Sequence, residues 1–149
     1  LLVDGYQRMQ GLLFRTEDAR FDTESWKPLL EQARNDASIR MVNRNAGSGT
    51  RVLIDRLLDG VQPPGFAMQV RSHNAVAAAI AQERADWGVG IAPVAEMYGL
   101  AFLPIQPEQY DLVIPATRNQ RPAIQALLAL LKDSETRDQL AALGFQASA

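Results

Sequence analysis

A polar, glycine-containing stretch at residues 43–51 groups side chains that suit anion recognition. Its candidate ligand-binding residues are Ser48, Gly49, Thr50 and Arg51. The stretch lies between an apolar run at 39–42 and a helical pattern at 52–58, so we expect a strand, a turn and a helix start. The first N–H groups of a helix have no partner within it and lie at the positive end of its dipole, which favours anions. An ordinary capped helix remains the alternative, because Ser and Thr are favoured N-cap residues.

A second polar turn follows the alternating run at 66–70. Its candidate ligand-binding residues are Ser72, His73 and Asn74, ahead of an expected helix over 73–83. Two helices that follow neighbouring parallel strands both begin at the carboxyl edge of the sheet, where open α/β sheets bind ligands. We therefore expect residues 47–51 and 72–74 to lie together.

The sequence gives less support to a catalytic site than to an anion-binding site. Ser48, His73 and Asp86 have the residue types of a hydrolase triad, but Ser48 does not stand in a Gly-x-Ser-x-Gly elbow. The sequence also has no Walker-type phosphate loop and no dinucleotide fingerprint. We therefore expect a binding protein that is not an enzyme, with no catalytic residue and no cofactor.

The composition of the chain argues against several classes of protein. The chain has 149 residues, 47% of them hydrophobic, and a formal net charge of -2. That charge argues against nucleic-acid contact, and no apolar run is long enough to predict a membrane span. One histidine and no cysteine make a structural zinc site unexpected. Cysteine-free composition fits a cytoplasmic location, with a periplasmic or other extracytoplasmic location as the alternative.

Strand and helix patterns alternate along the chain. Strands are expected at 12–14, 39–43, 66–70, 86–91, 101–105 and 111–115; helices at 23–35, 49–58, 73–83, from Pro93, at 122–131 and from Ser134 to Gly144. Such alternation predicts an α/β fold with a mainly parallel sheet flanked by helices.

Several motifs together resemble a known family. The stretches 43–51, 73–91 and 108–115, with the opening at 8–12, are similar in order and spacing to the periplasmic-binding-protein-like domain of molybdopterin-biosynthesis proteins and molybdate-responsive regulators. That family is related to the molybdate and tungstate receptors of transporters. The resemblance implies a type II binding-protein fold, with two α/β lobes, a small-ligand cleft, and a hinge near residues 14–16 and 110–112.

The resemblance also implies a domain division. Residues 15–111 would form the second lobe, which carries the anion site, and residues 1–14 with 112–149 would be a remnant of the first lobe. Family members carry a further N-terminal stretch of that lobe that has no counterpart in this sequence, so we expect either a fragment of a longer chain or a lobe that another chain completes or that stays incomplete. An incomplete lobe is expected to expose apolar surface, so we expect self-association or a fused module as a partner.

The implied function is non-catalytic sensing or delivery of a small oxyanion, molybdate or tungstate. Its oxygens would accept hydrogen bonds from N–H groups and from the hydroxyls of Ser48, Thr50 and Ser72, so no side chain would coordinate the metal. Glu108 and Tyr110, beside the second crossing segment, are further candidate ligand-binding residues. Two alternatives remain: a regulatory or protein-interaction module that has lost its ligand, and a receptor for a small organic anion such as a pterin or carboxylate.

Overall fold

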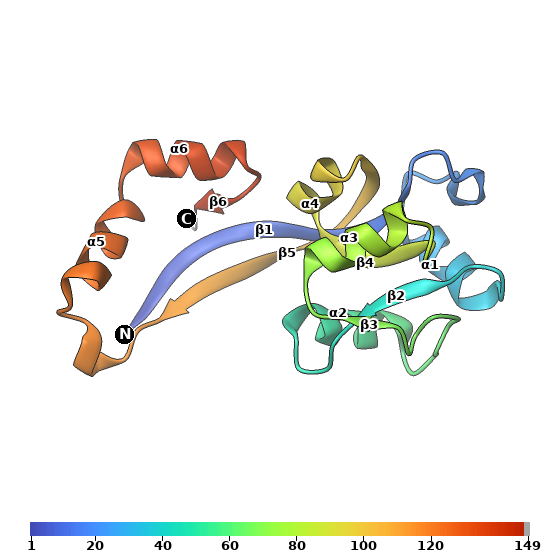
Figure 1. Cartoon of the computed structure of the whole chain (residues 1–149), viewed down its shortest axis with the longest axis horizontal. Coiled ribbons are helices and arrows are strands. Elements are labelled where there is room, and N and C mark those ends of the chain that lie inside the picture. The colour runs from blue at the N-terminus through green and yellow to red at the C-terminus, as the bar shows by residue number, and fades with distance from the viewer. Residues whose placement is uncertain (148–149) are drawn as a thin grey trace. The chain divides into compact units, whose positions relative to one another are not determined.

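The computed structural model describes residues 1–147, which form two compact units. We call Gln10–Gln106 the central unit, and Leu1–Met9 with the residues from Pro107 onward the terminal unit (Figure 1). Strands β1 (Leu2–Arg15) and β5 (Leu100–Val113) contribute residues to both. The unit boundaries thus fall inside these strands, a few residues from the boundaries expected at 14/15 and 111/112. The assignment of the units to lobes stays a prediction.

The sheet of the central unit is mixed. Strand β2 (Met41–Arg44) is parallel to both β3 (Gln69–Val70) and β4 (Trp87–Ile91). β1 is antiparallel to β4, with Gln10 opposite Ile91. The parallel order that the alternating strands and helices predict is therefore confined to β3, β2 and β4, because β1 enters from the opposite direction.

Helices cover both faces of this sheet. The 3-10 helix η1 (Ala19–Phe21), α1 (Trp26–Asn35) and α2 (Gly49–Leu58) bury their apolar residues with Leu12 and Trp87 in the main core. On the other face, α3 (His73–Ala81) packs against β2, β4 and α4 (Ala92–Met97). Gly88 permits this approach, since a Cβ at that position would lie 2.8 Å from a methyl group of Val76. Buried packing of this kind fixes where α2 and α3 begin.

The terminal unit has little buried apolar surface of its own. Besides the ends of β1 and β5, it contains η2 (Ala116–Arg118), α5 (Pro122–Leu130), α6 (Ser134–Ala142) and β6 (Gln146–Ala147). β6 pairs antiparallel with β1, and Ile114 is its one buried apolar residue within 1–147. α5 is strongly apolar, yet each of its residues is at least partly exposed. Across the described part of the chain, no helix has the length and hydropathy to cross a bilayer.

Candidate anion-binding site

The two polar turns singled out in the sequence lie at the same edge of the central sheet. β2 and β3 are parallel neighbours with Arg44 opposite Val70, so α2 and α3 both begin just beyond the ends of paired strands. The N–H of Asn45 donates to the carbonyl of Val70 at 3.0 Å and continues the pairing past β2. The structure therefore brings residues 47–51 and 72–74 together, as the order of strands and helices predicts.

Each turn contains a serine that caps the helix after it. The hydroxyl oxygen of Ser48 accepts from the N–H of Arg51 at 3.1 Å, and that of Ser72 accepts from the N–H of Ala75 at 3.1 Å. Gly47 has φ of +85°, a left-handed conformation that glycine adopts readily and that turns the chain into α2. Because each serine oxygen already accepts a hydrogen bond, its hydroxyl proton is available to donate.

The first turns of α2 and α3 also hold main-chain donors that the fold does not use. Within residues 1–147, the N–H groups of Gly49, Thr50 and Asn74 donate to no other residue. Donors of this kind bond to water or to a ligand, and the helix dipole favours a negatively charged one. Two helices therefore offer unused donors at one edge.

Thr50 differs from the two serines because it is buried. Thr50 and Gln10 are each 2% exposed, and Gln10 Nε2 lies 3.3 Å from Thr50 Oγ1. Gln10 belongs to β1, so the contact ties the first turn of α2 to the sheet. The side chain of Thr50 thus positions the turn, and contact between Thr50 and a ligand stays a prediction.

Arg51 is held by three contacts within the protein. Its Nε donates to Asp55 Oδ1 at 2.7 Å, its Nη1 donates to the carbonyl of Arg44 at 3.0 Å, and its guanidinium lies 4.8 Å from the ring centre of Phe66. A cation in the first turn of a helix interacts unfavourably with the positive end of the helix dipole. The carboxylate of Asp55, one turn along α2, offsets this interaction for Arg51. A ligand contact by Arg51 stays a prediction.

Arg44 is a residue that the list of candidates from the sequence missed. It is 8% exposed, its Nη1 lies 3.3 Å from His73 Nδ1, and its Nη2 lies 3.5 Å from the carbonyl of Arg71. The position of Arg44 at the end of β2, just ahead of the glycine-containing turn, is the feature of the sequence that could have identified it as a candidate site residue. Gln10 was missed as well, because nothing near it in sequence reveals a contact forty residues away. Arg44 brings a buried positive charge to the edge where α2 and α3 begin.

Glu108 and Tyr110 lie in the terminal unit, where the structure gives them local partners. Glu108 forms an ion pair with Arg8 at 2.5 Å. Tyr110 stacks on Tyr6 with ring centres 5.2 Å apart, and the guanidinium of Arg8 lies 5.3 Å from its ring centre. These contacts join β1 to β5 within that unit. The expectation that both residues contact a ligand stays a prediction.

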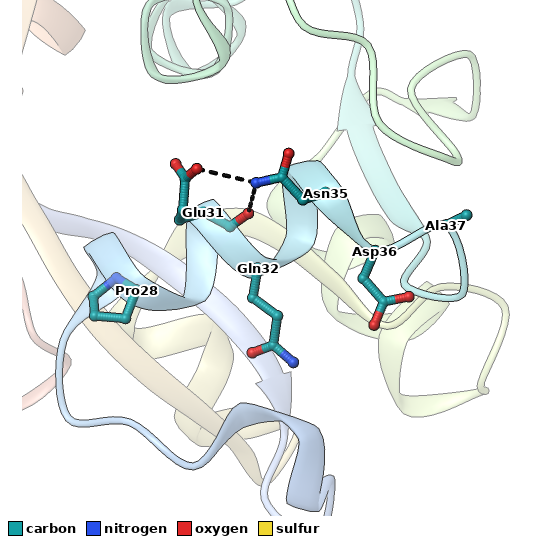
Figure 2. Close-up of a pocket in the computed structure, with 6 residues that line it drawn as sticks. All are labelled: Pro28, Glu31, Gln32, Asn35, Asp36 and Ala37. Atoms are coloured by element: carbon teal, nitrogen blue, oxygen red, sulfur yellow. Dashed lines mark hydrogen bonds between the residues drawn. The ribbon is translucent and has the colours of Figure 1, made fainter.

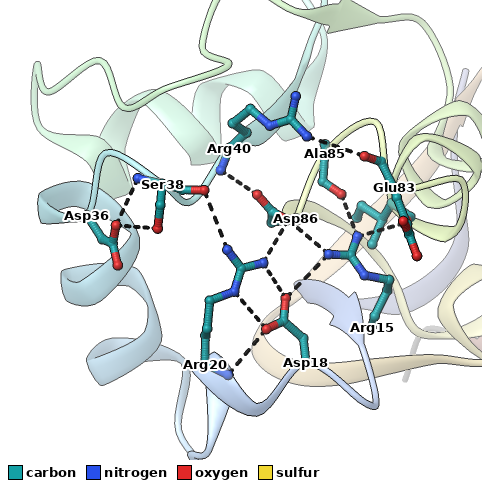
Figure 3. A network of polar contacts seen from close by, with 10 residues as sticks. Arg15, Asp18, Arg20, Asp36, Ser38, Arg40, Glu83, Ala85 and Asp86 are labelled. Atoms are coloured by element: carbon teal, nitrogen blue, oxygen red, sulfur yellow. Dashed lines mark hydrogen bonds and ion pairs between the residues drawn. The ribbon is translucent and has the colours of Figure 1, made fainter.

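Asp86 belongs to a charged network at the starts of β2 and β4 (Figure 3). Its Oδ1 accepts from Arg15 at 2.9 Å and from Arg20 at 2.8 Å, and its Oδ2 accepts from the N–H of Arg40 at 2.8 Å. Both guanidinium groups also contact Asp18. Asp86 comes before β4, whereas His73 comes after β3 at the opposite edge of the parallel strands, so the hypothetical Ser48–His73–Asp86 triad does not form.

Hydrogen bonding sets the charge states of this network. The side chain of Arg20 is the main cause that holds the pKa of Asp18 below its usual value. Burial raises the pKa of Asp86, but hydrogen bonds from the Arg40 N–H, Arg20 and Arg15 outweigh burial and lower it overall. Bonds to Asp18 and Asp86 raise the pKa of Arg20. Asp18 and Asp86 are therefore carboxylates that pair with the Arg20 guanidinium near neutral pH, as suits a structural anchor.

A surface depression beside α1 is separate from the donor turns (Figure 2). Its lining residues are Pro28, Glu31, Gln32, Asn35, Asp36 and Ala37. There Asn35 Nδ2 donates to the carbonyl of Glu31 at 2.8 Å and to its carboxylate at 3.0 Å. The depression is open to solvent and lacks an inward-facing cation. No cluster of three or more His, Cys, Asp or Glu side chains able to hold a metal occurs within residues 1–147.

Comparison with known proteins assigns the family. Residues 1–132 match the family described as the PBP superfamily domain. The chain belongs to the PBP superfamily. A curated relative of this PBP domain is the uncharacterized protein YvgK of Bacillus subtilis, which is 31% identical over 147 residues. The alignment takes in 95% of this chain and 45% of YvgK, so the chain spans just under half the length of that relative.

Solved structures share the fold of this PBP domain. A protein of Clostridium perfringens, assigned as a phosphate ABC transporter substrate-binding protein and solved with phosphate bound, has a TM-score of 0.76 at 11% identity, over 100% of this chain and 72% of that one. An ancestral amino acid-binding protein, a precursor of cyclohexadienyl dehydratase, has a TM-score of 0.65 at 15% identity, over 96% and 61%. These likenesses confirm the expected type II periplasmic-binding-protein-like α/β fold.

Proposed function

We propose that this PBP domain binds a small tetrahedral oxyanion without forming a covalent bond, and that molybdate or tungstate is its ligand. The observation that carries the proposal is the convergence of the first turns of α2 and α3 at Arg44. The oxyanion would sit at this edge and accept hydrogen bonds from Gly49, Thr50 and Asn74, with the serine hydroxyls as further donors. The binding step needs no cofactor and no catalytic residue.

The chemical groups at this edge of the central sheet favour an anionic ligand. Its available groups are N–H and O–H donors, and the guanidinium of Arg44 adds a buried positive charge. A helix N-terminus stabilises an anion by about 0.3 to 1 kcal/mol, and more where the site is partly buried. Two such ends at one edge act on the same ligand.

The identity of the oxyanion is the finer part of the proposal. Bound phosphate in the Clostridium perfringens protein is a tetrahedral oxyanion held in a related fold, which supports the class of ligand. Molybdate and tungstate rest on the sequence resemblance alone. Cytoplasmic location likewise stays a prediction.

A small organic anion is the second candidate, because the ancestral protein of similar fold binds amino acids. A carboxylate would use the same N–H donors and the guanidinium of Arg44. An amino acid also carries an ammonium group, which needs an acceptor oxygen. Asn45 Oδ1 is buried beside this turn, and no residue within 1–147 donates to it.

Calorimetric titration of the intact protein with molybdate, tungstate, sulfate, phosphate and a set of amino acids tests the proposal. Gly49→Pro sharpens the test, because Gly49 is the first residue of α2, where proline fits and removes only the N–H. The preceding Ser48, at φ -80° and ψ 146°, already has the conformation that proline requires of its neighbour. We expect Gly49→Pro to weaken molybdate binding about tenfold, the value of one hydrogen bond.

Gly49→Ala is the matched control, since it adds a Cβ but keeps the N–H. Its affinity should remain close to that of the unaltered protein. Equal affinities for Gly49→Pro and Gly49→Ala would place the ligand elsewhere. If no oxyanion and no amino acid binds, the domain is an interaction module that retains the fold without a ligand.

A further inference from the structure

The side-chain amide of Gln10 has one end that the fold does not use. Gln10 belongs to β1, is 2% exposed, and its Nε2 lies 3.3 Å from Thr50 Oγ1. Within residues 1–147 no group donates to its Oε1, and this oxygen is not completely enclosed by the protein. Buried amides normally have partners at both ends, because an unpaired polar group costs free energy when it leaves water. Water or a ligand therefore completes the amide of Gln10.

The unused end of this amide lies at the N-terminal end of α2. Cβ atoms in a helix point back toward its N-terminus, so the side chain of Thr50, the second residue of α2, leans toward that end. The N–H groups of Gly49 and Thr50, which donate to no other residue within 1–147, lie at the same end. Because Oε1 and Nε2 of Gln10 are bonded to one carbon, Oε1 also lies beside this turn. Two elements, β1 and α2, thus bring unused polar groups to one place.

An oxyanion requires a donor from Gln10, and the amide can supply one without losing Thr50. A hydroxyl can donate or accept, whereas the two ends of an amide have opposite roles. A half turn about the last side-chain bond of Gln10 exchanges Oε1 and Nε2. The Thr50 hydroxyl then donates to Oε1, and the unused end of the amide carries N–H donors. The hydrogen bond between Gln10 and Thr50 is present in both orientations.

We propose that Gln10 is a ligand-binding residue of the anion site, whose Nε2 donates to the oxyanion while its Oε1 accepts from the Thr50 hydroxyl. The inference rests on the proposed function and deepens it, because it adds a neutral donor from β1 to the donors of α2 and α3. The pairing of Gln10 with Ile91 of β4 fixes its main chain within the sheet. Gln10 therefore orients the ligand and adds no charge to the site.

NMR of the side-chain amide tests this contact in the unaltered protein. The NH₂ signals of Gln10 are assigned through the bonds of the residue, and those of the main chain serve as the reference. Titration with molybdate should shift the Gln10 NH₂ signals together with the main-chain N–H signals of Gly49 and Thr50. Shifts of the main-chain signals at saturation, without any change in the NH₂ signals of Gln10, would overturn the proposal.

Two substitutions separate ligand contact from support of the turn. Gln10→Met and Thr50→Val both remove the Gln10–Thr50 hydrogen bond, but only Thr50→Val keeps the amide that donates to the ligand. We expect Gln10→Met to bind molybdate about tenfold more weakly than Thr50→Val, the value of one hydrogen bond. Equal affinities would leave Gln10 with a structural role only. Should circular dichroism show that Gln10→Met does not fold, the NMR titration of the unaltered protein decides.

Failure of the proposed function gives a different result from failure of this inference. If the unaltered protein binds none of molybdate, tungstate, sulfate and phosphate, the proposed function and the role of Gln10 are both wrong. If molybdate binds and Gly49→Pro weakens it, while the NH₂ signals of Gln10 do not respond, only the role of Gln10 is wrong.

Discussion

Gln10 Nε2 and Thr50 Oγ1 lie 3.3 Å apart between two side chains that are each 2% exposed, although forty residues separate them in sequence. The contact links β1 to the first turn of α2, directly beneath the unused N–H groups of Gly49 and Thr50. A buried hydrogen bond of this kind fixes the turn that presents these donors. Its removal should therefore affect both stability and ligand affinity.

Thr50→Val tests this contact by replacing the hydroxyl with a methyl group of similar size. The amide of Gln10 then stays buried without its partner, so we expect the free energy of unfolding to fall by about 1 to 3 kcal/mol. Urea unfolding measures the loss. Gln10→Leu combined with Thr50→Val should recover part of it, because neither polar group is then left unpaired. A double variant that is less stable than Thr50→Val would contradict this account.

Arg51→Met should affect stability more clearly than binding. The substitution removes the ion pair with Asp55 and the approach to Phe66, which are worth about 1 kcal/mol together. Asp55 is exposed, so the ion-pair part should diminish in high salt. Molybdate affinity should change less than threefold, since the guanidinium is already held within the protein. A tenfold, salt-dependent loss of affinity would instead identify Arg51 as a ligand residue.

Asp86→Asn should destabilise the central unit without affecting oxyanion binding. The substitution removes the carboxylate that pairs with Arg15, whose side chain is 13% exposed, and with Arg20, whose side chain is 38% exposed. Breaking the more buried pair with Arg15 costs about 3 kcal/mol. Thermal unfolding and molybdate titration of the same variant separate the two effects. Thr16→Ala serves as a control near the network, since its hydroxyl bonds only to exposed Glu17 among the described residues. A large change in affinity for Asp86→Asn would show that the two edges of the sheet are coupled.

Acid should weaken the fold through Asp18 and Asp86. Both have pKa values below the ordinary value in the folded protein, so the folded state binds fewer protons than the unfolded state as pH falls. Their contribution is fully present above the unfolded pKa of about 4 and is lost as pH falls through the lower folded values. Urea unfolding between pH 7 and pH 3 should show the decline. Asp18→Asn with Asp86→Asn should show a flatter dependence than the unaltered protein.

The apolar surface of the terminal unit should drive self-association of this chain. Leu127 and Leu130 on α5 are 38% and 53% exposed, and Val113 is 79% exposed. Leu130→Glu should shift the chain toward the monomer in light scattering at high concentration. Met97→Gln is the matched control, because Met97 is 71% exposed but lies in the central unit. A strictly monomeric chain at all concentrations would contradict the expectation.

Local sequence patterns predicted the helices of the site better than its strands, because β3 covers only Gln69–Val70 of the strand expected at 66–70. α2 begins and ends at the residues expected from its cap and periodicity, 49 and 58. β5 differs, because two strands were expected at 101–105 and 111–115, whereas the structure has one strand from Leu100 to Val113, with Pro104 inside it. A strand at the end of the sheet order tolerates proline, since one side of it has no ladder to interrupt.

Long-range contacts set the limit of what the sequence could predict at the site. Ser48 and Ser72 follow from cap preferences, which depend on residues three positions away. The contacts of Gln10 with Thr50 and of Arg44 with His73 span forty and twenty-nine positions. Only the pairing of β2 with β3 and of β1 with β4 brings these residues together. No local pattern contains that information.

The charged network of Asp86 stands before β2 and β4, whereas the polar turns stand beyond the far ends of β2 and β3. This separation has an evolutionary consequence. After gene duplication, one copy can accumulate substitutions at Ser72, His73 or Asn74 without losing the ion pairs that anchor its strands. Under the proposed function, descendants would acquire new ligands through substitutions in these turns, while the ion pairs that anchor the strands persist.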